Sequence, residues 1–283
     1  MRKYYTLYIF LLCVFLLTIS CRKTHTRYKT RYTKSEKTTH SCQLVSAETN
    51  HRNVDTAFED YFTPTKTPSK EEILLYRVGY KVSYNIRTRQ PNWVAWHLTA
   101  EHVDGDVPRD NSYYEDEEVP NPRATNEDYR GSGWSKGHMC PAGDNKWSEL
   151  AMRESNLLTN ICPQDRSLNS GVWNKIEQDC RRWAKKYGDV YIVCGPIFLN
   201  REHETFGRNK VVVPEAFFKV ILCLQGKPKA IGFVIRNNDG KKKRDQFINT
   251  VDDVERITGF DFFPSLPDDV EDSVEAAANI DEW

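Results

Sequence analysis

SGWSKGHMCPAGD (132–144) and TNICPQDRSLNSGVWNKIE (159–177) are the two stretches on which the fold of this chain depends. In the first, a histidine follows a glycine, where the backbone can turn tightly. Residues 156–161, around the start of the second, are expected to form a short buried strand. After it, apolar side chains recur at helical spacing from Asn169 to Tyr187, and Gly188 can end a helix there. We therefore expect a short strand and then a helix at 169–187.

The same stretches hold side chains suited to phosphodiester hydrolysis. That reaction requires a base that deprotonates water, a cation near the departing oxygen, and positive groups that hold the phosphate. His138 can be the base, and Lys136 is a cation two residues before it. Taken singly, each residue has a simpler explanation, since Asn169 could cap the helix and Glu177 could lie on its solvated side. Only their combination points to catalysis.

This combination closely resembles the motif of the DNA/RNA non-specific endonuclease family, which includes endonuclease G-like enzymes. The resemblance covers about residues 73–271, because NWVAWHLT (92–99), VCGPIF (193–198) and VPEAFFKVIL (213–222) follow in the family's order. It implies an α+β fold with a ββα-metal (His-Me finger) motif. It also implies hydrolysis of DNA and RNA without sequence specificity, with Mg²⁺ as cofactor, Mn²⁺ as a substitute ion, and 5′-phosphate ends as products.

The resemblance assigns roles residue by residue. His138 matches the general base, and Asn169 matches the one direct protein ligand of the Mg²⁺. Glu177 matches an acid that holds a water of the ion's hydration shell, Asn160 an asparagine that supports the site, and Arg109 a phosphate-contacting arginine. A neutral imidazole with a pKa of about 6.5 can accept a proton from water at neutral pH. Asn160 or a backbone carbonyl would then have to fix its tautomer.

Two positions depart from the family pattern. Lys136 stands where an arginine is usual, and Ser135 replaces an aspartate. Lysine cannot make the two-pronged phosphate contact of arginine. We expect an active enzyme, and the alternative is a catalytically weak or inactive nuclease-like lipoprotein that binds nucleic acid. A cysteine hydrolase that uses Cys140 beside His138 is a third, weaker hypothesis.

The rest of the chain indicates strands that pair locally. We expect strands at 73–84 and 92–99, paired around 87–91, and further strands at 189–194, 215–224 and 229–235, of which the last two form a hairpin. The charged segment 104–128 is expected to be a long surface excursion. Thr250 should cap a helix at 251–258 that ends at Gly259. Strands outnumber helices, so the fold class is α+β with a mixed, mainly antiparallel sheet.

The two ends of the chain differ from its middle. Residues 1–20 have the layout of a signal peptide, and Cys21 follows them as in a bacterial lipoprotein, so membrane attachment through a lipidated Cys21 is expected. Residues 21–54 form a lipid-attached or flexible basic linker, 55–272 the nuclease domain and 273–283 an acidic tail. We expect a secreted protein or a periplasmic or outer-membrane lipoprotein, not a cytoplasmic one.

Charge and cysteine content leave several questions open. The formal net charge is zero, so composition gives no global indication of a nucleic-acid partner. Six cysteines lie beyond the targeting segment, and an even number permits disulfides without choosing a pairing. The oligomeric state is open as well, a homodimer included.

Overall fold

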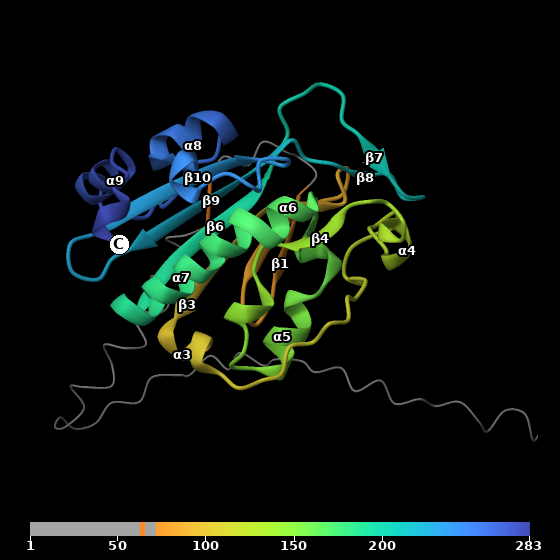
Figure 1. Ribbon diagram of the computed structural model, residues 1–283, viewed down its shortest axis with the longest axis horizontal. Coiled ribbons are helices and arrows are strands. Elements are labelled where there is room, and N and C mark those ends of the chain that lie inside the picture. Colours follow the sequence, from red (N-terminus) through yellow and green to blue (C-terminus); the bar gives the residue numbers. More distant parts are fainter. Residues whose placement is uncertain (1–62, 66–71) are drawn as a thin grey trace, which may run out of the picture. The chain divides into compact units, whose positions relative to one another are not determined.

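A seven-stranded antiparallel sheet forms the centre of the fold (Figure 1). The structure is a computed structural model, and it describes residues 63–65 and 72–283. The strand order is β1-β2-β3-β6-β9-β10-β11. The strands are β1 (Glu72–Tyr76), β2 (Lys81–Asn85), β3 (Gln90–Thr99), β6 (Asp189–Ile197), β9 (Ala216–Cys223), β10 (Lys229–Arg236) and β11 (Ile248–Asn249). The predicted mixed α+β class with a mainly antiparallel sheet is confirmed.

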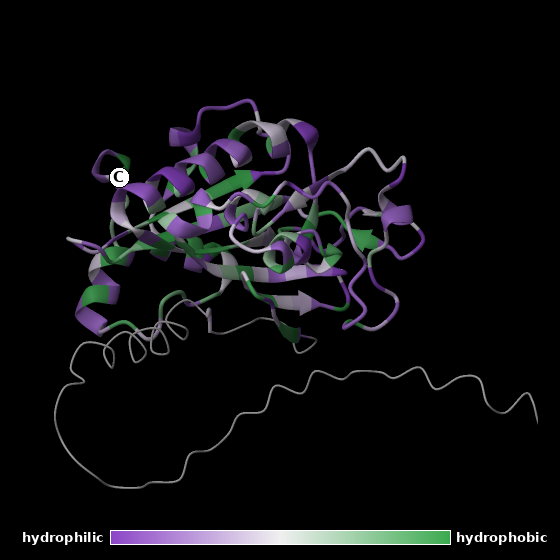
Figure 2. Cartoon of the chain, turned by 90° about the horizontal axis from the view of Figure 1, so that it is seen from below, coloured by the Kyte–Doolittle hydropathy of each residue, from purple (hydrophilic) through white to green (hydrophobic). Residues whose placement is uncertain are grey.

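Both faces of this sheet are covered, which explains why its central strands are largely apolar, with buried Lys219 on β9 as an exception. All eight residues of β9 are buried. Phe217 and Ile221 point to one core, which they share with α7 (Asn174–Tyr187), while Phe218 and Val220 point to the other, which they share with α8 (Val251–Thr258). Successive side chains of a strand point to opposite faces, so each face needs its own apolar set. Figure 2 shows the resulting hydrophobic strands beneath hydrophilic outer helix surfaces.

The helix expected at 169–187 begins earlier and in three parts. It starts with α6 (Arg166–Leu168), continues through a π-helical turn at Asn169–Trp173 that is kinked at Gly171, whose backbone is not helical, and becomes regular in α7. Asp165 is the N-cap, since its side chain accepts hydrogen bonds from the backbone N–H groups of Ser167 and Leu168. Gly188 ends the helix with φ of 97°, as predicted.

Two strand predictions are wrong in their bounds. The run 73–84 is not one strand but the pair β1 and β2, which a tight turn with a backbone hydrogen bond from Arg77 to Tyr80 connects. Gly79 lets this turn pack closely against Asn145, because a Cβ at position 79 would lie 2.0 Å from Oδ1 of that residue. The strand expected at 156–161 is instead a 3-10 turn at Leu158–Asn160 that leads into β5 (Ile161–Gln164).

The other pairings and the capped helix are confirmed. β2 and β3 are antiparallel neighbours, and β9 and β10 form the expected hairpin, with Lys229 opposite Cys223. The hydroxyl of Thr250 accepts a hydrogen bond from the backbone of Asp253 at the start of α8. Gly259 closes this helix in the left-handed conformation, with φ of 74°.

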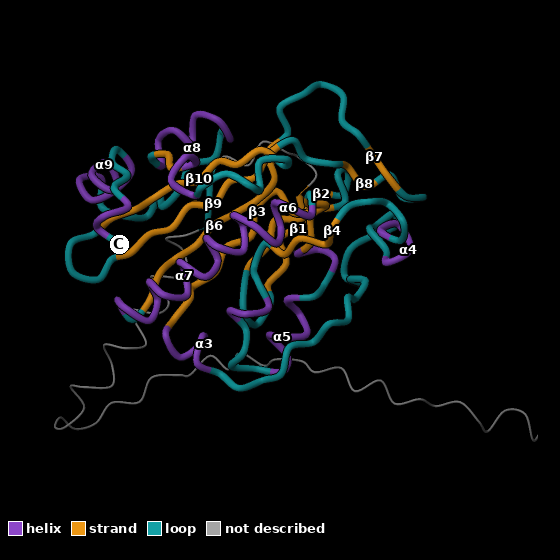
Figure 3. The backbone as a smooth tube through the Cα atoms, viewed as in Figure 1, coloured by secondary structure: helices purple, strands orange, loops and turns teal. Residues whose placement is uncertain are grey.

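The remaining elements are short and surround the sheet. They are α3 (Ala100–Asp104), α4 (Asn126–Tyr129), β4 (Ser135–His138), η1 (Ala142–Asp144), α5 (Glu149–Ser155), β7 (Thr205–Phe206), β8 (Val211–Val212), η4 (Arg244–Phe247), α9 (Asp268–Glu275) and η5 (Ile280–Glu282). Figure 3 shows the long loop between α3 and α4, the excursion expected at 104–128. Buried Asp116 holds it in place by accepting hydrogen bonds from Arg77 and Thr159.

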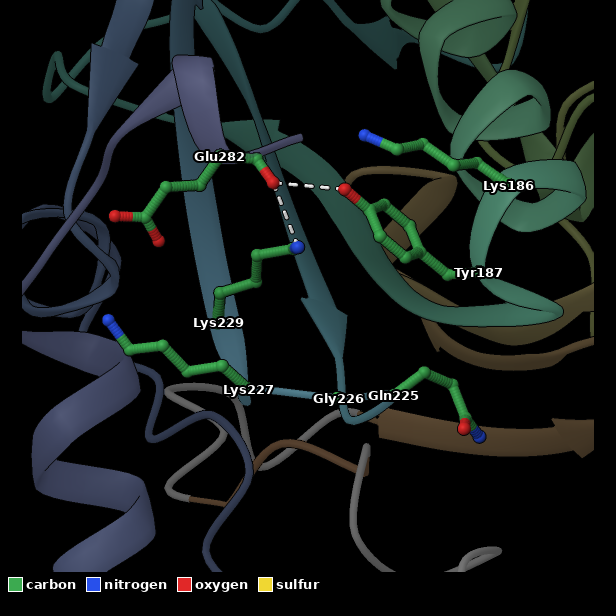
Figure 4. A pocket seen from close by; sticks show the side chains of 7 residues that line it. All are labelled: Lys186, Tyr187, Gln225, Gly226, Lys227, Lys229 and Glu282. Atoms are coloured by element: carbon green, nitrogen blue, oxygen red, sulfur yellow. Dashed lines mark hydrogen bonds between the residues drawn. The ribbon is translucent and has the colours of Figure 1, made fainter.

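The acidic C-terminal segment lies against the domain. Trp283 packs on Trp183, with ring centroids 4.5 Å apart. The hydroxyl of Tyr187 and the ammonium of Lys229 both donate to the carbonyl oxygen of Glu282, at 2.9 Å each (Figure 4). The chain beyond α9 is thereby fixed to α7 and β10.

The cysteines that the structure describes are all thiols. Cys140, Cys162, Cys180, Cys194 and Cys223 are free and buried. Cys42, the predicted signal peptide and most of the predicted linker and early domain residues (1–62 and 66–71) fall outside the described residues. Over 63–65 and 72–283, none of the helices has the length and apolar character needed to cross a bilayer.

Candidate active site

The expected ββα motif is formed by β4, β5 and the helix that follows them. β4 and β5 are antiparallel, with His138 opposite Ile161 at one end of the ladder. The indole N–H of Trp173 donates to the carbonyl oxygen of His138, at 3.2 Å, and so ties the helix to the end of β4. Gly137 is needed for close packing and not for a turn, because a Cβ there would lie 2.1 Å from the Gln164 side chain.

A cleft of about 210 Å³ opens over this motif. Of the six residues predicted for the site, five line it: Arg109, Lys136, His138, Asn169 and Glu177. Asn160 does not. Among its other polar lining residues are Tyr113, Asn174 and Arg181, which the sequence analysis had not identified.

His138 is held as a neutral imidazole. It is 7% exposed, and its Nε2 lies 2.8 Å from Oδ1 of Asn156. The amide nitrogen of Asn156 donates to the carbonyl of Asp110, so the carboxamide oxygen must face the ring. Nε2 therefore carries the proton, and Nδ1 keeps a free lone pair. Burial lowers the pKa of His138 to about 4, well below the value of about 6.5 assumed from the sequence.

Asn160 has a structural role next to the cleft. It is fully buried, and its carboxamide bonds the backbone of Cys140 twice, accepting from the N–H at 2.9 Å and donating to the carbonyl at 2.8 Å. It also donates to the carbonyl of Ser155. The suggestion that Asn160 fixes the tautomer of His138 is wrong, because Asn156 makes that contact. Asn160 instead holds the segment that follows His138.

Asn169 is not needed as a helix cap, because Asp165 fills that position. Its turn is fixed from outside by the loop that follows β10. The N–H of Val172 donates to the carbonyl of Gly240, and a Cβ on Gly240 would lie 2.1 Å from the backbone of Ser167. The cleft, not the helix end, therefore explains an asparagine at 169.

Glu177 lies on α7 and faces the same cleft. Burial raises its pKa to about 7, and the positive charges of Lys219 and Arg181 act in the opposite direction. Lys219 is fully buried behind the cleft, and its ammonium lies 4.4 Å from the ring centroid of Trp173. A buried ammonium near Glu177 favours the ionised carboxylate that a hard cation requires.

Three cationic side chains line the cleft. Lys136 donates to Oδ1 of Asn126 at 2.6 Å and lies 4.7 Å from the ring centroid of Tyr113. Burial lowers the pKa of Lys136. Arg109 is exposed, and Arg181 is held by buried Asp144 through a hydrogen bond of 2.8 Å. These charges converge where a phosphate would have to bind.

Cys140 cannot act as a nucleophile here. Its side chain is fully buried in the core and does not line the cleft. Burial raises the pKa of its thiol far above the usual range, so the reactive thiolate does not form at neutral pH. The cysteine-hydrolase hypothesis is therefore wrong.

A larger hollow lies elsewhere, between α7 and the C-terminal segment. Its volume is about 510 Å³, and its lining includes Lys186, Lys227 and Lys229. In Figure 4 Lys229 reaches the backbone carbonyl of Glu282, whereas the ammonium groups of Lys186 and Lys227 do not. No histidine lines it. The smaller cleft is the better candidate because it combines a base, a carboxamide and phosphate-binding charges.

Part of what the sequence analysis missed was visible in the sequence. Asn174, Glu177 and Arg181 are spaced by three and four residues, so a helix places them on one face. Asn156 could not be found in this way. Its contact with His138 depends on α5, which was not predicted.

Comparisons with known proteins agree with this site. The sequence profile of the DNA/RNA non-specific endonuclease family matches residues 59–269. Mitochondrial nuclease EXOG of Mus musculus is 38% identical over 206 residues, which are 66% of this chain and 56% of that protein. Nuclease C1 of Cunninghamella echinulata var. echinulata is 39% identical over 217 residues, or 70% of this chain and 86% of that protein. This chain thus spans little more than half of the EXOG relative.

The same likeness is found in three dimensions. A crystal structure of the complex of EndoG with EndoGI superposes with a TM-score of 0.67 and 29% sequence identity. The match covers 79% of this chain and 95% of that chain.

Proposed function

This chain belongs to the DNA/RNA non-specific endonuclease family, and we propose that it hydrolyses phosphodiester bonds in DNA and RNA without sequence specificity. The observation that supports this proposal most directly is the cleft. Neutral His138 lines it together with Asn169, Glu177 and three cationic side chains. Zero net charge does not oppose this proposal, because the positive groups converge locally. The cleft lining is rich in cationic side chains suited to phosphate, so phosphate contacts rather than base contacts should dominate.

The donor set fits Mg²⁺. Mg²⁺ prefers oxygen ligands and keeps several waters, so one or two protein oxygens suffice. We assign the carboxamide oxygen of Asn169 as direct ligand and Glu177 as the acid that orients a hydrating water. When bound there, Mg²⁺ would supply positive charge close to the departing 3′ oxygen.

The side chains of the chain itself perform the remaining steps. Nδ1 of His138 accepts a proton from the attacking water, because Asn156 occupies Nε2. Lys136, Arg109 and Arg181 hold the phosphate and offset its charge. Water attacks the phosphorus, and cleavage of the bond between phosphorus and the 3′ oxygen leaves 5′-phosphate and 3′-hydroxyl ends.

The test is a nuclease assay on supercoiled plasmid and on RNA. The full chain should degrade both with Mg²⁺ or Mn²⁺, and degradation should stop when EDTA is added. His138→Ala should lower kcat by about 10²- to 10⁴-fold while the circular dichroism spectrum stays unchanged. Asn238→Ala, an exposed site outside the cleft lining, is the matched control. Nucleic-acid binding without turnover by the unmodified protein would instead favour the binding-protein alternative.

The amino-terminal residues support a proposal about location. The apolar run 4–19 followed by Cys21 favours export and lipid attachment. When the full chain is expressed in a bacterium that is fed labelled palmitate, the wild-type protein should become labelled and the Cys21→Ser variant should not. Labelling of both proteins, or of neither, would contradict attachment at Cys21.

A further inference from the structure

A group of three acidic side chains lies between α8 and α9, in a part of the chain that does not line the cleft. Asp252 and Glu255 are three residues apart on α8, so they share a helix face, and Glu275 is the last residue of α9. One carboxylate oxygen of each lies within 4.8 Å of the others. Two helices that follow each other in the chain thus bring three acids to one point.

Glu275 is the feature that an ordinary acidic surface does not explain. It is 7% exposed, and its Oε1 has no hydrogen-bond partner among the described residues. Leaving a charged oxygen buried without a partner is costly, so such groups are normally paired or bound to a metal. This orphaned oxygen belongs to the same side chain that reaches the other two carboxylates.

The charges around Glu275 do not neutralise it. The groups that act most strongly on it after burial are Glu255, Glu271, Asp252 and Asp261, all of them acids. A bound cation would remove this repulsion.

Neighbouring contacts fix the geometry of the cluster. Oε1 of Glu255 accepts a hydrogen bond from the backbone N–H of Phe262 at 2.7 Å. Asp261 accepts another from the hydroxyl of Thr65 at 2.9 Å. Val254 precedes Glu255, and Val274 precedes Glu275. Both valines are buried in the hydrophobic core that α8 shares with the sheet. The acids therefore stand on a rigid base.

We propose that Asp252, Glu255 and Glu275 form a structural calcium site that fastens α9 to α8. All three ligands are carboxylates, which suit hard cations and not zinc, whose structural sites use cysteine and histidine. Ca²⁺ accepts irregular geometry and several carboxylates, whereas Mg²⁺ demands a near-ideal octahedron. Asp252 is exposed, so water can complete the coordination on that side.

Calcium titration of the full chain, freed of metal and then kept in millimolar Mg²⁺, tests this site. The background of Asn169→Ala removes the proposed catalytic ligand, so that any calcium effect must come from elsewhere. With ~5 mM Ca²⁺ and a Kd of about 10⁻⁴ M, the Tm should rise by about 5 °C or more. Isothermal titration calorimetry should give one Ca²⁺ per chain.

Matched variants locate the effect. Glu275→Gln keeps the shape of the side chain and should abolish the calcium-dependent rise in Tm. Asp252→Asn, at the exposed side, should reduce it even if Glu275→Gln folds poorly. Asp272→Asn removes one exposed charge from the same helix and should keep the full response.

Three outcomes would overturn the proposal. These are no response of Tm to calcium, a response that survives in both Glu275→Gln and Asp252→Asn, and a site that Mg²⁺ fills equally well. If Glu275→Gln stabilises the calcium-free protein and no ion binds, the acids instead share a proton.

Discussion

At the scale of single residues, the contact between His138 and Asn156 controls when the base is available. Because the pKa of His138 is lowered to about 4, its imidazole stays neutral as the pH falls from 7 toward 5. Protonation of His138 should therefore not limit activity at mildly acidic pH. The same shift costs stability in acid, since the unfolded chain takes up this proton below a pH of about 6.5 and the folded chain only near 4.

Asn156→Asp tests this control. A carboxylate in place of the carboxamide would favour the imidazolium and raise the pKa of His138 by about 1–3 units. The acidic limb of the pH profile of kcat/KM at saturating Mg²⁺ should move upward by a similar amount. Asn279→Asp, at the far C-terminal segment, should leave the profile in place. An unmoved limb in Asn156→Asp would show that His138 does not set it.

Lys219 allows a second prediction at this scale. Its ammonium is buried against Trp96 and Trp173, and its Nζ has no hydrogen-bond partner among the described residues. Lys219→Met removes the positive charge that acts on Glu177 and Asp144, and removal of one partner from a set of buried charges often costs a protein about 3–5 kcal/mol. Without this charge the pKa of Glu177 should rise further, so half-maximal activity should require more Mg²⁺.

Urea unfolding and a Mg²⁺ titration of the plasmid assay measure the two effects. Unchanged or higher stability, or half-maximal activity at an unchanged or lower Mg²⁺ concentration, would contradict this account. Lys227→Met, at a surface turn, is the control for loss of one charge.

At the scale of elements, the loop after β10 fixes the turn that carries Asn169. Gly240→Ala would place a Cβ 2.1 Å from the carbonyl carbon of Ser167, so the loop must move away. We expect a loss of about 1–3 kcal/mol in the free energy of unfolding and a weaker apparent affinity for Mg²⁺. Gly226→Ala meets nothing within 4 Å and should cost only about 1 kcal/mol of backbone strain at its positive φ, without an effect on Mg²⁺. Equal effects of both variants on Mg²⁺ affinity would argue against this role of the loop.

Elements with a complete local signal could be predicted from the sequence. Thr250, Asp253 and Gly259 specify both ends of α8, and the short turn between β9 and β10 specifies a hairpin. The helix that carries Asn169 was placed by its apolar stripe, but its start was not. Its true cap, Asp165, precedes a π-helical turn that packing against Gly240 maintains, and no local pattern encodes such a contact.

The candidate site shows the same division. Its histidine, asparagine and glutamate lie on contiguous stretches and could be identified by motif. Asn156 and Asp144 could not, because each reaches the site through a tertiary hydrogen bond, to His138 and to Arg181. Burial also moved the pKa of His138, which spacing alone cannot indicate.

At the scale of the whole molecule, the C-terminal segment should contribute to stability and not to catalysis. Removal of residues 279–283 exposes Trp183 and deletes the carbonyl that Tyr187 and Lys229 share. We expect a loss of about 2 kcal/mol and a Tm several degrees lower. Specific activity per folded molecule at 25 °C should stay the same. The Tm of Trp283→Phe should lie between that of the truncated chain and that of the complete chain. An unchanged Tm after truncation would refute the expected contribution of the segment to stability.

The buried thiols of the central core have a practical consequence. Alkylating reagents can reach Cys140, Cys162, Cys180, Cys194 or Cys223 only when the surrounding strands and helices separate. Their modification rates, followed peptide by peptide in mass spectrometry, therefore record how often each part of the interior opens under native conditions. A protein with this architecture therefore carries its own reporters of local opening, and no label needs to be engineered.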